Sequence, residues 1–164
     1  MEDDYMSVIE ELSALLDEKK ALFTEYEQCT NNLTQCDIDS IEDYITRRGQ
    51  LANEIDKITA KINDQCNNAP NCAVLQGAIN NTSNYTDIPQ ELKRLFSRGQ
   101  EIFSIISQIS AQEPQIRQRM KTQRAELIKK IKMAKNTPKI SKYLNTIAVP
   151  VENGNLLDEK YDKA

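Results

Sequence analysis

Four cysteines are the residues of this chain with the clearest potential for chemistry, because thiolates bind zinc and form disulfides. They form two pairs, Cys29 with Cys36 and Cys66 with Cys72. Each pair brackets a predicted break between helices, and in a helical hairpin the two breaks lie at opposite ends, roughly 40 Å apart at the helical rise. That separation argues against one zinc site of four thiolates. A disulfide between Cys66 and Cys72 stays open, but we expect free thiols that pack as small apolar residues, and neither metal nor cofactor.

Catalytic side chains are scarce in the rest of the chain. There is no His, which removes the commonest general base and metal ligand. No glycine-rich phosphate loop, nucleophile elbow or paired metal-ligand motif occurs. Residues 47–55 faintly resemble small all-helical chorismate mutases, which need several inward Arg or Lys residues, whereas the first predicted helix offers only Lys19 and Lys20. We therefore expect that the protein is not an enzyme.

Charge is distributed unevenly along the chain. The net charge is −4, yet residues 1–18 carry seven acidic residues and no basic one, and residues 115–142 carry ten Lys or Arg against Glu126 alone. A basic stretch can follow a phosphate backbone, but this one has no aromatic residue and no groove-reading motif. We expect a solvated basic face or an acidic protein partner, and no nucleic acid. Arg47 and Arg48 are expected only to keep a long helix soluble.

The sequence also bears on location. No apolar run approaches the roughly 20 residues needed to span a bilayer. The acidic start, Met1-Glu2-Asp3-Asp4, is the opposite of a basic signal peptide. We therefore expect no membrane insertion and a cytoplasmic protein.

Apolar residues spaced three and four apart predict an all-α fold that begins with a hairpin. The first helix is predicted from about Asp4 to Gln35, and the second from an N-cap at Asp37 to near Gln65. The turn between them is so short that the two helices must be antiparallel. Residues 72–86 are predicted to form a short helix and a loop.

A long third helix follows. Thr86 or Asp87 is the predicted cap, with Pro89 in the first turn, where a missing N–H costs nothing. Pro114 falls inside the pattern, but the apolar stripe resumes in register after it. We therefore expect a kink near Ser110 and not the end of the helix.

The apolar seam of this third helix is longer than its neighbours can cover. The helix has about 49 residues against about 32 for the first, so it would extend roughly 25 Å further. Each large apolar side chain left in water would forgo about 1.5–3 kcal/mol, so the tail, a second copy or a foreign partner must cover these side chains. We expect a binding surface there. The predicted organisation is an elongated antiparallel helical bundle or coiled coil over residues 1–138, with a flexible C-terminal tail over residues 139–164. The seam consists of Ile88, Leu92, Leu95, Gly99, Ile102, Ile106, Ile109, Glu113, Ile116, Met120, Gln123, Leu127 and Ile131.

Two stretches of the hairpin resemble a known family. Residues 12–23, LSALLDEKKALF, and residues 36–48, CDIDSIEDYITRR, are similar in pattern to FlgN-type flagellar export chaperones, which are related in kind to FliT-type ones. The ending from Gly154 to Lys160 also resembles such sequences. The resemblance implies a cytoplasmic chaperone that keeps hook-associated flagellar proteins soluble and unpolymerised and delivers them to the type III export apparatus.

The resemblance also implies where the client binds, because the family is thought to use its C-terminal region. An amphipathic helix of the client would lie against the uncovered stripe, and the basic flank would select acidic clients. The alternative is a structural coiled-coil or adaptor protein whose long helices pair in a homodimer and that has no export role. The residues expected to bind the partner are Ile116, Met120, Leu127, Ile131, Tyr143 and Leu144.

Overall fold

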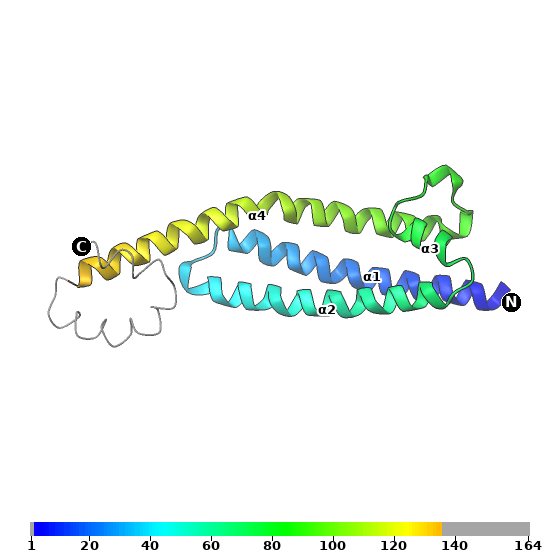
Figure 1. Cartoon of the computed structure of the whole chain (residues 1–164), viewed down its shortest axis with the longest axis horizontal. Coiled ribbons are helices and arrows are strands. Elements are labelled where there is room, and N and C mark those ends of the chain that lie inside the picture. The colour runs from blue at the N-terminus through cyan, green and yellow to red at the C-terminus, as the bar shows by residue number, and fades with distance from the viewer. Residues whose placement is uncertain (1, 136–164) are drawn as a thin grey trace. The chain divides into compact units, whose positions relative to one another are not determined.

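The structure is a computed structural model, and it describes residues 2–135. Within these residues the fold is all-α and has no strand, which confirms the predicted fold class. The chain divides into two compact units that part between Ile116 and Arg117, whereas the sequence analysis carried one domain to residue 138. The helices are α1 (Glu2–Leu33), α2 (Ile41–Asn68), the short α3 (Cys72–Ile79) and the long α4 (Lys93–Ala134), as Figure 1 shows.

The predicted hairpin is confirmed, with a correction at its turn. α1 and α2 lie side by side and antiparallel (Figure 1). Asp37 is not the N-cap of α2, because a 3-10 turn, Ile38–Ser40, lies between Asp37 and the start of α2 at Ile41. The Asp37 side chain makes no capping hydrogen bond, and its carbonyl oxygen accepts from the Ser40 N–H at 3.0 Å. The turn that leads directly into α2 is therefore tighter than an α-helix.

α4 begins later than predicted. Two 3-10 turns, Tyr85–Asp87 and Gln90–Leu92, occupy the expected first turns, and α4 begins at Lys93. The cause is Pro89, whose ring disfavours the helical region for the residue before it. Ile88 is accordingly extended, with φ −83° and ψ 134°. Proline here separates two turns and does not start the helix.

Pro114 lies inside α4, and the helix continues through it to Ala134. The prediction that Pro114 does not end the helix is confirmed. The kink expected near Ser110 stays a prediction.

The unit of residues 1–116 is a three-helix bundle closed at one end by α3. α1, α2 and the first half of α4 run up, down and up, with α3 beside the start of α4 (Figure 1). Their apolar faces meet in one core, and each fully buried aliphatic side chain contributes about 1.5–3 kcal/mol. The core contains Ile9, Leu12, Leu16, Ile58, Ile62, Cys66, Leu75, Ala78, Ile79, Ile88, Leu92, Leu95 and Ile102.

A close backbone approach attaches the end of α3 to α4. A Cβ added at Gly99 would lie 2.1 Å from the Ile79 carbonyl oxygen, so only glycine fits there. Beside it, Asn81 has a left-handed φ of 55°, and its Nδ2 donates to the carbonyl oxygens of Ala78 at 3.1 Å and Phe96 at 3.0 Å. The loop after α3 is thereby hydrogen-bonded to the helix that it packs on.

Gly99→Ala should lower the free energy of unfolding by about 1–3 kcal/mol, because the new methyl group collides with backbone that has no side-chain freedom to move aside. Gly49→Ala is the matched control, since nothing lies within 4 Å of a Cβ there and Gly49 is inside α2. That change should raise the free energy of unfolding by about 0.5–1 kcal/mol. Urea unfolding followed by circular dichroism measures both. Equal effects of the two substitutions would contradict the close approach at Gly99.

Candidate partner-binding site

The residues expected to bind a partner fall into four groups. Leu127 is 59% exposed, and Met120 and Ile131 are half-buried. Ile116 is buried. Tyr143 and Leu144 lie outside the described residues.

For Ile116, the expectation of an exposed binding residue is wrong. Its side chain is only 5% exposed and is one of the buried residues of α4. The reason is helical register: Ile102, Ile109 and Ile116 are spaced by seven and therefore lie on one face, and all three are buried. Burial of the seam thus continues to Ile116, the last residue of the first unit.

Beyond Ile116 the seam continues along α4, whose remaining part is strongly basic. At 100° per residue, Met120, Leu127 and Ile131 lie within about 40° of one another, so they form one apolar stripe. Residues 117–135 carry eight Lys or Arg and Glu126, a net charge of +7. Arg117, Lys121 and Arg124 follow one edge of the stripe, and Lys130 lies on the other edge. We call Met120, Leu127 and Ile131 with this basic border the α4 stripe.

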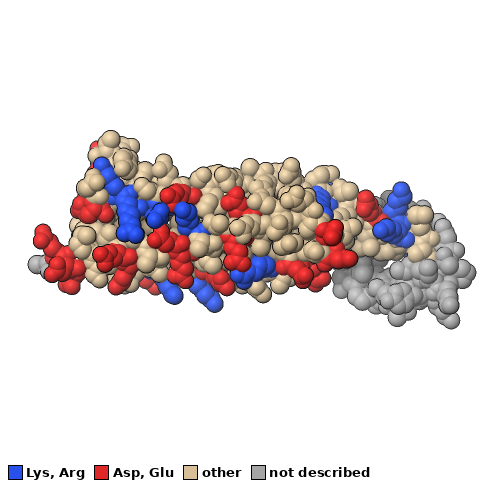
Figure 2. Space-filling model, turned by 180° about the vertical axis from the view of Figure 1, so that it is seen from behind, with Lys and Arg blue, Asp and Glu red and all other residues tan. Residues whose placement is uncertain are grey.

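The three-helix bundle has the opposite charge. Residues 1–116 carry 20 acidic and 9 basic residues, a net charge of −11. Figure 2 shows carboxylates spread along most of the face that it presents, with lysine and arginine between them. The reversal of charge coincides with the boundary between the two units. Positive charge is therefore concentrated on the segment that carries the α4 stripe, and negative charge on the bundle.

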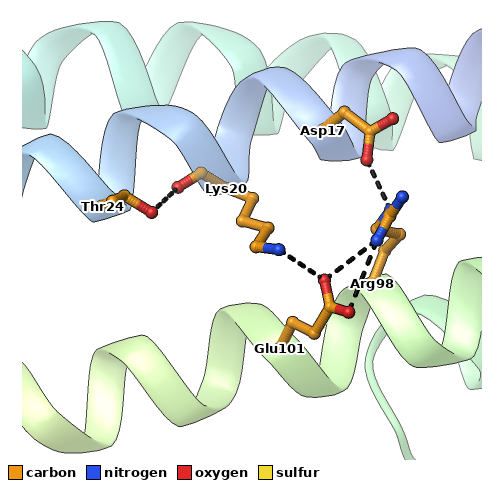
Figure 3. A network of polar contacts seen from close by, with 5 residues as sticks. All are labelled: Asp17, Lys20, Thr24, Arg98 and Glu101. Atoms are coloured by element: carbon orange, nitrogen blue, oxygen red, sulfur yellow. Dashed lines mark hydrogen bonds and ion pairs between the residues drawn. The ribbon is translucent and has the colours of Figure 1, made fainter.

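Ion pairs set the register of α4 against α1 (Figure 3). Arg98 Nε lies 2.5 Å from Asp17 Oδ1, and Lys20 Nζ lies 2.8 Å from Glu101 Oε2. The hydrogen bond from Lys20, followed by that from Arg98, lowers the pKa of Glu101 below its ordinary value. Because these side chains are all partly exposed, each pair contributes about 0–1 kcal/mol, so their role is alignment more than stability.

Arg48 joins all three long helices, which the sequence analysis missed. Its Nη2 donates to the Tyr26 hydroxyl at 2.8 Å and also to Glu113 Oε1, and its guanidinium lies 4.6 Å from the Tyr26 ring centroid. The side chain is 14% exposed, so its expected role in solubility is wrong. Arg47 differs, because it pairs with Glu25 at the more exposed edge, Nη2 to Oε1 2.7 Å. The sequence did contain a signal for this role of Arg48. Glu113 is a carboxylate within the apolar seam, where it needs a basic partner.

The four cysteines, all within the described residues, form no disulfide. Cys29 and Cys66 are buried, and Cys36 and Cys72 are half-buried. Burial, with a smaller effect from nearby Cys72, raises the pKa of Cys66 to about 11. The Cys72 thiol donates to Asn67 Oδ1 at 3.6 Å. Cys66 is therefore a packing residue that stays protonated near neutral pH.

Between residues 2 and 135, no cluster of three or more His, Cys, Asp or Glu has the arrangement to hold a metal ion. Across the same range, no helix is both long and apolar enough to cross a membrane. No protein-family model, curated protein or solved structure matches this chain. Within residues 2–135, the exposed apolar surface of α4 is therefore the feature that bears most directly on function.

Arg48→Ala should lower the free energy of unfolding by about 1–3 kcal/mol, because it leaves Glu113 and the Tyr26 hydroxyl without their shared donor. Arg47→Ala is the control, and its exposed ion pair predicts a loss of about 0–1 kcal/mol. Urea unfolding of the single variants, of Glu113→Gln and of the double variant Arg48→Ala/Glu113→Gln measures the coupling. Strict additivity of the two changes would show that Arg48 and Glu113 do not interact.

Cys66 should react with iodoacetamide at pH 8 at least about tenfold more slowly than Cys72, because the thiolate is the nucleophile and Cys66 is buried with a raised pKa. Mass spectrometry of the labelled peptides measures the two rates separately. In urea the two cysteines should react alike, which serves as the control. Equal rates in the folded protein would contradict the burial of Cys66.

Proposed function

We propose that this protein binds another protein, by holding an amphipathic helix of that client on the α4 stripe. The single observation that supports this is the exposure of Leu127, 59%, on a helix whose seam is buried at Ile102, Ile109 and Ile116. A large apolar side chain gains about 1.5–3 kcal/mol when it is covered. Covering the stripe with a client helix would gain that energy for Leu127 and part of it for its half-buried neighbours.

The spacing of the stripe suits a helix as the ligand. Met120, Leu127 and Ile131 stand seven and four residues apart, the spacing at which two helices interlock their side chains. The basic border would pair with carboxylates on the edges of a client helix. Such pairs add more to specificity and to the rate of association than to affinity, so an acidic client would be favoured.

We further propose that the client is a hook-associated flagellar protein. In this proposal the chain is a cytoplasmic chaperone that keeps its client soluble and unpolymerised and then passes it to the type III export apparatus. What supports this assignment is the resemblance of residues 12–23 and 36–48 to FlgN-type flagellar export chaperones. The alternative, a structural coiled-coil homodimer or adaptor, has no such client.

Replacing Leu127 and Ile131 together by Glu should abolish co-purification with tagged hook-associated flagellar proteins, because two carboxylates would then face the apolar side of the client helix. The helix content should be unchanged, since both residues lie on α4 without full burial. Co-expression, affinity purification and quantitative mass spectrometry measure the retained client. Circular dichroism measures the helix content.

The matched control is Gln118→Glu with Ala125→Glu, two exposed positions roughly 140–160° around α4 from Met120, which should retain the client. Undiminished binding by the Leu127 and Ile131 variant would refute the α4 stripe as the docking surface. If the wild-type protein retains no hook-associated flagellar protein, the flagellar assignment is wrong.

A further inference from the structure

A second surface of the bundle has the features of a helix-binding groove. It lies along the outside of the hairpin, between α1 and α2, and has a volume of about 530 Å³. Ala14 and half-buried Leu15 form an apolar floor. The groove is lined by Glu11, Ala14, Leu15, Glu18, Lys61, Asp64, Gln65 and Asn68.

The groove is on the side of α1 that does not contact α4. Asp17 and Lys20, which pair with Arg98 and Glu101 of α4, mark the opposite side. At 100° per residue, Leu15 lies about 160° around α1 from Asp17. None of the residues that line the groove comes from α4. The groove is therefore an open face of the bundle.

The border of the groove is acidic on both helices. Glu11 and Glu18 stand seven residues apart on α1, Asp64 stands across from them on α2, and Lys61 is the base among the lining residues. A ligand for this groove needs an apolar stripe over Leu15 and basic residues on both of its edges. Seven residues of helix span about 10 Å, so two turns of such a ligand would fill the groove.

The chain itself contains a helix with this chemistry. The α4 stripe puts apolar Met120 and Leu127 seven residues apart, and Arg117 and Arg124 along its edge have the same spacing as Glu11 and Glu18. The segment of residues 117–135 has a net charge of +7, against −11 for residues 1–116. The groove and the α4 stripe are therefore complementary in charge, in apolar contact and in spacing.

We propose that the α4 stripe of one copy docks in the groove between α1 and α2 of a second copy, and that the reciprocal contact closes a dimer. A one-way contact between two different surfaces assembles into a ring or an open filament, whereas mutual exchange of the two contacts closes a dimer. This goes beyond the proposed client binding and does not depend on it. In the dimer the exposed Leu127 is covered, and a client helix has to displace the second copy.

Sedimentation velocity of the full chain tests the contact. The wild-type protein should change from monomer to dimer with rising concentration, and the dimer should weaken as salt rises from about 0.05 to 0.5 M, because the contact is largely between charges. Replacing Glu11, Glu18 and Asp64 together by Lys should raise the dissociation constant at least about tenfold. The matched control replaces Glu10, Asp56 and Glu91 by Lys, three exposed acidic residues that do not line the groove. It makes the same change in net charge and should leave the dimer in place.

A charge exchange makes the test specific for these two surfaces. Arg117, Lys121 and Arg124 are replaced together by Glu in a second variant, whose dissociation constant should also rise at least about tenfold. In a mixture of the two variants, each reversed surface meets a partner of opposite sign, so a heterodimer should form at concentrations at which each variant alone is monomeric. Circular dichroism of each variant verifies that its helix content equals that of the wild type.

Three results would overturn the proposal. The first is a wild-type protein that stays monomeric at every concentration, which leaves the groove to a basic helix of another protein. The second is a dimer that survives reversal of the groove, as pairing of two α4 helices in a coiled coil predicts. The third is a mixture of folded variants that forms no heterodimer. None of these experiments contains a client, so the proposal can fail while client binding stands, and the reverse also holds.

Discussion

The apolar seam of α4 is the constraint on which the rest of the structure depends. Most residues of the seam up to Ile116 are buried, and those up to Ile102 complete the core that α1 and α2 form. From Met120 onward the same spacing continues, but Leu127 is exposed. Helical spacing keeps the apolar residues on one face along the whole of α4, whether or not another helix covers that face. One continuous helix therefore contributes both to the core and to an exposed apolar surface.

Polar contacts define how the bundle is aligned more than they hold it together. The pairs from Asp17 to Arg98 and from Lys20 to Glu101 lie at the partly exposed edge between α1 and α4. Arg48 differs, because it is largely buried and joins α2 to both other long helices. Its partner on α4 is Glu113, the residue before Pro114. Apolar stripes can slide by a turn at little cost, whereas a buried guanidinium has one carboxylate within reach. The alignment that results places Ile116 inside the bundle.

The separation of charge gives the two proposals a common basis. In both proposals the basic helical segment supplies the attraction, to the acidic bundle of a second copy in one and to an acidic client in the other. If both contacts use the α4 stripe, they exclude each other. A second copy would then shield the stripe when no client is present, which limits nonspecific contacts of an exposed leucine. Exchange of a copy for a client would expose the acidic groove at the same time.

The sequence by itself determined the helices, the antiparallel hairpin and the continuation of α4 through Pro114, because periodicity and turn length are local properties. Short-range errors arose where a proline or a tight turn acts on its neighbours, as at Ile88 and Asp37. The tertiary structure alone decided where burial of the seam ends, so that Ile116 is inside and Leu127 is outside. It also decided the partners of Arg48 and the open groove beside Leu15. These features depend on residues far apart in the chain, such as Arg48 and Glu113, which no local pattern brings together.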